Sequence, residues 1–174
     1  PLGIGPALQH ALGVGIAAGA VAAVTGLALL VNKQRELIDQ QAKMAQRLHT
    51  TYLSLANLGR AGELAGVGLE QIEVGARQLD INLGKALQGT NAQSDAFKRL
   101  GLNAREVSAL PLDERISKIN AALKENISST ERSAVAADVF GARGASMILS
   151  LDPETIAEAA RQVKIFGLNL SEVD

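Results

Sequence analysis

Few side chains in this sequence suggest chemistry, and those that do stand apart from one another. The two histidines, His10 and His49, lie in different segments, and neither has a carboxylate at the spacing of a metal site. The adjacent acids Asp113 and Glu114 are a formal candidate for a glycosidase pair, but neighbouring residues on a helix point in different directions. We therefore expect no catalytic residue, no cofactor and no metal, and we interpret the chain as a non-enzymatic protein.

A second candidate is the run Gly141-Ala142-Arg143-Gly144, which resembles a phosphate-binding loop only in its glycines. We interpret it as a corner between helices, with Arg143 as an exposed side chain. A helix-turn-helix reader of DNA is also disfavoured. The chain has 17 basic and 18 acidic residues, a net charge of -1, and no basic recognition face.

The composition indicates which elements position these residues. The chain is 47% hydrophobic but only 2% aromatic, so its apolar content is mostly Ala, Leu, Val and Ile. With 17 glycines and few β-branched runs, this mixture favours closely packed helices over a sandwich or barrel. Because there is no cysteine, disulfides and thiolate metal sites are excluded. We expect an all-α protein, with an apolar helix and a coiled-coil helix followed by a small multi-helix module.

Residues 1–31 are expected to hold the apolar helix. Ala11 to Val31 contains no charge, and its 21 residues would span about 31 Å as a helix, close to the hydrocarbon thickness of a bilayer. Ala11, Gly15, Gly19 and Ala23 lie four residues apart, which is the spacing of close helix packing. Two interpretations stay open: a transmembrane helix, or a helix hidden inside an oligomer or a tube.

Residues 32–59 are expected to continue into a coiled-coil helix that ends at Gly59. Positions at alternating three- and four-residue spacing predict an oligomer seam. Its members are Leu27, Leu30, Gln34, Leu37, Gln41, Met44, Leu48, Thr51, Leu55 and Leu58. Since the following sequence offers no long partner helix, we expect self-association, most simply as a homotrimer. The alternative is one amphipathic helix packed on its own domain.

Residues 60–93 are expected to form a glycine-punctuated helical stretch that ends in a polar linker, Gly89 to Ser94. A short pattern recurs at Gly66, Gly101 and Gly167, in which a glycine is followed by an apolar residue and then Asn or Gly. It predicts a helix-to-helix corner, with the glycine left-handed past one helix. At the second corner, Asn103 is expected to cap the next helix, with Glu106 placed for a capping box.

Residues 94–174 are expected to form a compact module, with four or five short helices between Ser94 and Gly167. Pro111 opens one amphipathic helix, whose apolar face is Leu112, Ile116, Ile119, Leu123 and Ile127. Residues 128–131 open the next helix, which points Val135, Val139 and Phe140 inward and ends at Gly141. Asp152-Pro153 opens a third helix, with Ile156, Val163, Ile165 and Phe166 as its apolar side.

Several landmarks follow one another in a fixed order between Ala96 and about Val173. They are Phe97, the turn Leu100-Gly101-Leu102, Glu131-Arg132 followed by small apolar residues, Phe140-Gly141, and Arg143-Gly144. This order resembles a segment of tail tape-measure proteins of long-tailed bacteriophages and prophages. The resemblance covers less than half of the chain and carries no active site. Phe97, Gly101, Phe140, Gly141 and Gly144 are therefore expected to act as structural landmarks.

The resemblance implies a structural component inside the phage tail that sets tail length and assists DNA passage through the host envelope. It implies location in the virion and then in the host envelope, with the tail tube, tail-tip proteins and assembly chaperones as partners. The host membrane is a further partner on ejection, and genomic DNA lies adjacent without sequence-specific binding. Because the chain starts at Pro1, we expect a fragment or C-terminal portion of a longer protein. Two alternatives remain: a membrane-anchored oligomeric coiled-coil protein, such as a secretion translocator or pore-forming component, and a soluble helical adaptor.

Overall fold

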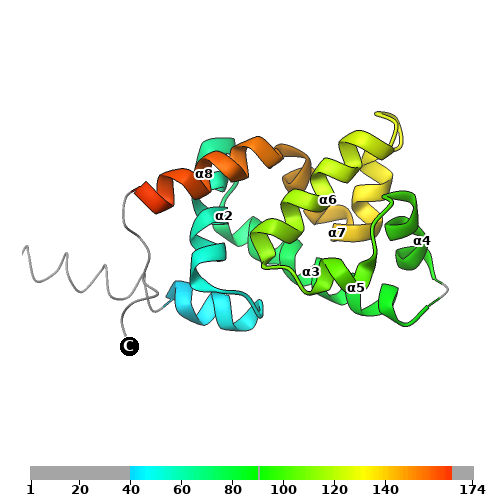
Figure 1. Ribbon diagram of the computed structural model, residues 1–174, viewed down its shortest axis with the longest axis horizontal. Coiled ribbons are helices and arrows are strands. Elements are labelled where there is room, and N and C mark those ends of the chain that lie inside the picture. The colour runs from blue at the N-terminus through cyan, green and yellow to red at the C-terminus, as the bar shows by residue number, and fades with distance from the viewer. Residues whose placement is uncertain (1–39, 90, 166–174) are drawn as a thin grey trace, which may run out of the picture. The chain divides into compact units, whose positions relative to one another are not determined.

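The computed structural model describes residues 40–89 and 91–165, and these residues are helical without any strand, as the sequence predicts. The chain divides into two units, Pro1–Gln41 and Ala42–Asp174, and nearly all of the described residues belong to the second. A helical segment over residues 40–47 precedes the labelled helices of Figure 1. These are α2 (Tyr52–Ala65), α3 (Leu69–Leu87), α4 (Ala92–Arg99), α5 (Ala104–Ser108), α6 (Leu112–Asn126), α7 (Arg132–Ser150) and α8 (Pro153–Ile165).

Two helix pairs carry most of the packing in the second unit. α3 packs along α7, α2 packs against α8, and α6 contacts both α7 and α8 (Figure 1). The predicted face of α6 is confirmed: Leu112, Ile116, Ile119, Leu123 and Ile127 are all buried. So are Val135, Val139 and Phe140 of α7 and Ile156 and Val163 of α8. Ile165, predicted on the same side of α8, is instead 79% exposed, and Phe166 lies outside the described residues. This compact unit begins at Ala42, whereas the sequence predicted a module that begins at residue 94.

The predicted coiled-coil helix over residues 32–59 is wrong in the part that the structure describes. The chain turns at Leu48–His49, where His49 has a φ of 46°, and Thr51 caps a new helix by accepting a hydrogen bond from the Ser54 N–H at 3.1 Å. Leu48, Leu55 and Leu58 are at most 2% exposed because they lie in this chain's own core. Of the six described seam positions, these three are buried and Met44 is partly buried against the same core, whereas Thr51 is exposed. Leu27, Leu30, Gln34 and Leu37 lie outside the described residues.

Gly59 does not end a helix either, because α2 continues through it to Ala65. The turn comes at Gly66, with a φ of 71°, and its N–H donates to the carbonyl of Gly62. Gly101 adopts the same left-handed conformation, with a φ of 68°, so two of the three predicted corners are confirmed. Gly167 lies outside the described residues. Asn103 caps α5 by accepting from the Arg105 N–H at 2.9 Å.

Gly141 bends α7 where the sequence predicted that the helix stops. Its φ of 72° and ψ of 161° are non-helical, but the helix resumes at once and runs to Ser150. Beyond the bend, Gly144 crosses Gly75 of α3 so closely that a Cβ on Gly144 would lie 3.0 Å from the Gly75 Cα. Two glycines at the crossing let the backbones of α3 and α7 approach, which larger residues would prevent.

The apolar stretch Ala11 to Val31, with its small residues Ala11, Gly15, Gly19 and Ala23, lies outside the described residues. Within residues 40–89 and 91–165, no single helix has the length and apolar character to cross a membrane. The bent pair α7 and α8 meets these two criteria only when both helices are taken together.

Candidate functional site

Side chains from neighbouring helices satisfy the carbonyl groups at several helix ends. The last carbonyls of a helix have no partner within it, so buried helix ends need donors from elsewhere. Asn126 Nδ2 donates to the Leu100 carbonyl at 2.7 Å, after α4, and Arg132 Nε donates to the Leu123 carbonyl at 3.1 Å, near the end of α6. Asn120 Nδ2 donates to the carbonyls of Ile148 and Leu151 at the end of α7. These bonds fix which helix end meets which neighbour.

The bend in α7 is held in the same way. Asn82 of α3 is buried, and its Nδ2 donates to the carbonyls of Asp138 and Val139, each at 3.0 Å. Residues 138 and 139 lie just before Gly141, whose non-helical conformation interrupts the regular ladder of helical hydrogen bonds. Asn82 therefore supplies donors where the bend would otherwise leave carbonyls buried and unpaired.

Replacing Asn82 with alanine should lower the free energy of unfolding by about 1–3 kcal/mol, because buried acceptors would lose their donor. Urea denaturation followed by circular dichroism measures the change. Gln88→Ala, at the exposed end of α3, is the control and should change the value by less than about 0.5 kcal/mol. Equal effects of the two substitutions would contradict the role of Asn82.

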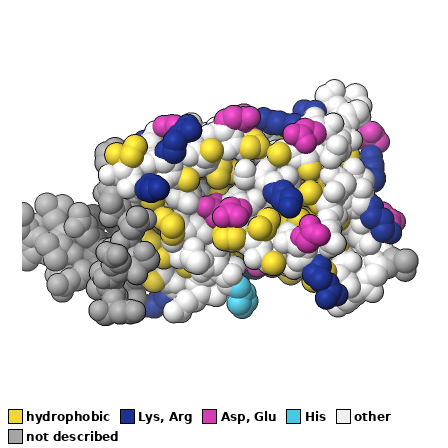
Figure 2. Space-filling view, viewed as in Figure 1, with side chains coloured by type: hydrophobic (Ala, Val, Ile, Leu, Met, Phe, Trp, Pro, Cys, Tyr) yellow, Lys and Arg dark blue, Asp and Glu magenta, His cyan; other side chains and the backbone are white. Residues whose placement is uncertain are grey.

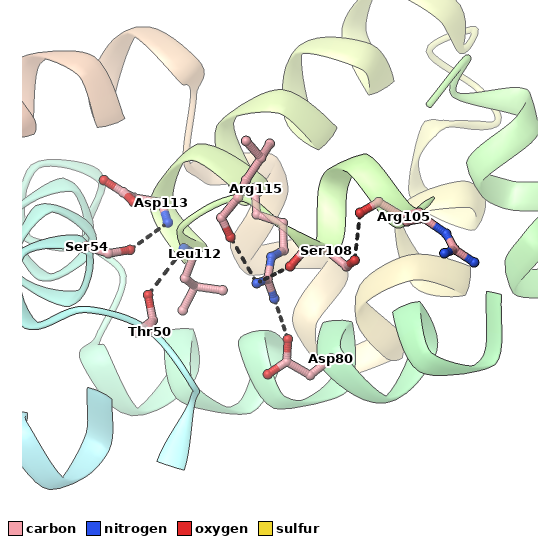
Figure 3. A network of polar contacts seen from close by, with 9 residues as sticks. Thr50, Ser54, Asp80, Arg105, Ser108, Leu112, Asp113 and Arg115 are labelled. Atoms are coloured by element: carbon pink, nitrogen blue, oxygen red, sulfur yellow. Dashed lines mark hydrogen bonds and ion pairs between the residues drawn. The ribbon is translucent and has the colours of Figure 1, made fainter. Parts of the chain in front are cut away.

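The start of α6 is the most polar buried region described, and Figure 3 shows it from close by. Pro111 has no side-chain acceptor for the first N–H groups of the helix. Hydroxyl groups from an earlier segment of the chain supply the missing acceptors. The N–H of Leu112 donates to Thr50 Oγ1 at 3.3 Å, and the N–H of Asp113 donates to Ser54 Oγ at 2.9 Å. The entry into α6 is thereby tied to the beginning of α2.

Two charged side chains of this first turn, Asp113 and Arg115, are each only 8% exposed, and they point away from each other (Figure 3). Arg115 reaches α3, where its Nη1 lies 2.5 Å from Asp80 Oδ1. Its Nη2 also donates to the carbonyls of Ser108 and Leu110, at 3.2 and 3.0 Å. Asp113 instead accepts a hydrogen bond from Asn57 Nδ2 of α2 at 2.7 Å.

Burial raises the pKa of Asp80 above its ordinary value of 3.8, although the charge and hydrogen bond of Arg115 and the charge of His49 oppose the shift. A carboxyl whose folded pKa is raised binds its proton more tightly in the folded state. Its stabilising contribution is therefore complete below the unfolded pKa and is lost as the pH rises through the folded pKa.

As the pH rises above 3.8, the free energy of unfolding of the wild type should therefore fall relative to that of Asp80→Asn. Urea denaturation of both proteins between about pH 3 and pH 7 measures this difference, because the asparagine removes only this titration. If the wild type keeps the same stability relative to Asp80→Asn across this range, or becomes relatively more stable as the pH rises, the raised pKa is contradicted.

The structure separates the other residues that the sequence singled out for chemistry. His49 lies exposed at the turn before α2, and His10 lies outside the described residues. Across residues 40–89 and 91–165, no group of three or more His, Asp or Glu side chains is placed to hold a metal ion. Arg143 is exposed and lines a surface groove of about 540 Å³ with Glu70 and Gln71 of α3. On the face drawn in Figure 2, basic and acidic side chains are intermixed.

The five landmark residues have packing and turn roles. Phe97 and Phe140 are among the largest fully buried side chains described. Gly101 and Gly141 have positive φ, and Gly144 forms the close crossing with α3. Asn57, Asn82 and Asn120 were not predicted from the sequence, although their side chains make buried polar bonds. The available signal was an asparagine beside apolar residues within a helix, such as Asn120 after Ile119.

The described residues thus form an all-α module whose helix ends are joined by buried polar side chains. No family model, curated protein or solved structure matches the chain.

Proposed function

We propose that this chain is part of a tail tape-measure protein of a long-tailed bacteriophage or prophage. One observation carries the proposal: five of the landmarks in the sequence resemblance have packing or turn roles that this fold needs. Phe97 and Phe140 are buried, Gly101 and Gly141 adopt backbone conformations that favour glycine, and Gly144 allows a close helix crossing. Residues that are buried, or that need the backbone freedom of glycine, are constrained by the fold. Their shared order therefore supports a shared structural unit more strongly than a shared order of surface residues would.

In this function the chain is a structural component of the tail. It helps to set tail length during assembly and assists DNA passage through the host envelope after ejection. Tail tube, tail-tip proteins and assembly chaperones are its partners. Self-association as a homotrimer now depends on the seam residues before Gln40, because Leu48, Leu55 and Leu58 are buried in their own core. The module at residues 42–165 is then a folded unit attached to an oligomerising segment.

An in-frame deletion of residues 42–165 in the parent gene tests the proposal. These residues would span at most about 186 Å as one continuous helix at 1.5 Å per residue, which sets the upper limit of tail shortening. We expect peptides of the module in purified wild-type virions by mass spectrometry, and shortened tails for the deletion in electron micrographs. Virions without these peptides, together with unchanged tails, would contradict the proposal.

The uncharged stretch Ala11 to Val31 supports a second candidate, a membrane-anchored oligomeric protein. Gly19→Arg distinguishes the two, because a charge near the middle of a span costs about 2.5–3.5 kcal/mol on insertion scales. A permanent anchor would lose membrane association in cells that contain no phage tails. A tail component with this substitution would assemble normally and fail only at DNA delivery, and Gly19→Leu controls for helix packing.

A further inference from the structure

We propose that the groove between α2, α6 and α8 binds an arginine side chain presented by a protein partner. The groove has a volume of about 610 Å³. Asn57 lines it from α2, Asp113 and Glu114 from the first turn of α6, and Ile156 and Ala157 from α8. On the face drawn in Figure 2, hydrophobic side chains lie among acidic and basic ones. This inference does not depend on the tape-measure proposal.

One buried oxygen of a residue that lines the groove has no hydrogen-bond donor among the described residues. Asn57 is 7% exposed, and its Nδ2 is committed to Asp113 Oδ2 at 2.7 Å. This bond fixes the orientation of the amide. The amide oxygen, Asn57 Oδ1, is left buried without a hydrogen-bond partner among the described residues. A buried acceptor without a donor is unfavourable, so a ligand with N–H groups would gain from reaching it.

The carboxyl group beside this acceptor, Asp113, forms no ion pair among the described residues. The Asp113 carboxylate has a neutral amide as its partner, and the neighbouring cation Arg115 points away to Asp80 (Figure 3). Lys118 is the basic side chain that lines the groove. It is exposed one helical turn from Glu114, which is also exposed. A cationic ligand would therefore supply the ion pair that Asp113 does not form among the described residues.

A guanidinium group meets these requirements together. It is always charged and presents five N–H donors in a plane, which suits a carboxylate and an amide oxygen at the same time. The apolar lining, which includes Leu110 and Ile156, suits the aliphatic stem of arginine. The ligand class is thus a basic side chain on an apolar stem, as a partner protein would present it.

Nuclear magnetic resonance titration of the full chain tests the proposal. The probe is N-acetyl-arginine methylamide, and its isosteric control is N-acetyl-citrulline methylamide, which has no charge. We expect saturable shifts at the amides of Asn57, Asp113 and Ala157 with a millimolar dissociation constant, and at least about tenfold weaker binding of the citrulline probe. Equal binding of the two probes, or no saturable shift, would overturn the proposal and leave water alone to satisfy Asn57.

Three variants locate the binding. Asp113→Asn should weaken the arginine probe about tenfold, whereas Glu114→Gln should change it less than about threefold. Ala157→Leu places a larger side chain on the exposed face of α8 that lines the groove, and it should block binding while leaving the buried polar bonds intact. If Asp113→Asn does not fold, Ala157→Leu decides the question alone. Undiminished affinity in Ala157→Leu would overturn the assignment of the groove.

Discussion

Replacing Gly141 with alanine should lower the free energy of unfolding by about 2–4 kcal/mol. Gly141 has a φ of 72° and a ψ of 161°, a backbone region that residues with a Cβ enter at a cost of about 1–3 kcal/mol. An added Cβ would also lie 2.7 Å from Gln78 Cγ, so the Gln78 side chain would have to move. The alternative is to straighten the helix, which would remove the carbonyls of Asp138 and Val139 from Asn82. Urea denaturation of both proteins measures the loss.

Gly84→Ala is the matched control for this substitution. Gly84 lies in α3 and is exposed, and an added Cβ would meet nothing within 4 Å. Alanine in a helix interior is favoured over glycine by about 0.5–1 kcal/mol, so this variant should be more stable than the wild type. The double variant Gln78→Ala with Gly141→Ala removes the contact between the added Cβ and the Gln78 side chain, so the loss that remains measures the backbone strain. If Gly141→Ala were as stable as the wild type, the bend would not require glycine.

Phe140→Ala should lower the free energy of unfolding by about 3–5 kcal/mol, which is the range for truncating a buried aromatic side chain. Phe140 is 0% exposed and comes directly before the bend, and an added Cβ on Gly144 would lie 3.1 Å from Phe140 Cβ. Removing the ring would leave a cavity that the close backbone crossing of α3 and α7 cannot easily fill. Because small proteins have total stabilities of about 5–15 kcal/mol, this loss should also lower the midpoint of thermal unfolding clearly.

Ile165→Ala is the control for apolar truncation in a helix. Ile165 ends α8 and is 79% exposed, so its truncation should change the free energy of unfolding by less than about 0.5 kcal/mol. A loss at Ile165 as large as that at Phe140 would mean that the exposed end of α8 is buried in solution. A small loss at Phe140 would instead contradict its place in the core.

The sequence alone determined the all-α class and the helices whose signals are local. Pro111 and Asp152-Pro153 mark the starts of α6 and α8, because proline fits the beginning of a helix. Gly66 and Gly101 mark corners, because the left-handed conformation there favours glycine. The buried face of α6 followed from residue spacing, since that helix has one apolar side. Each of these features depends on neighbouring residues in the chain.

Only the tertiary structure decided which surfaces meet. The spacing of Leu48, Leu55 and Leu58 showed that a face is buried, but the same spacing suits a partner chain and the chain's own core. The turn at His49 and the positions of Asn57, Asn82 and Asn120 depend on groups far away in the sequence, such as the Asp113 carboxylate and the carbonyls of α7. The groove between α2, α6 and α8 exists because three distant segments meet there. Local spacing encodes a helix and its buried side, whereas the identity of what covers that side is a long-range property of the folded chain.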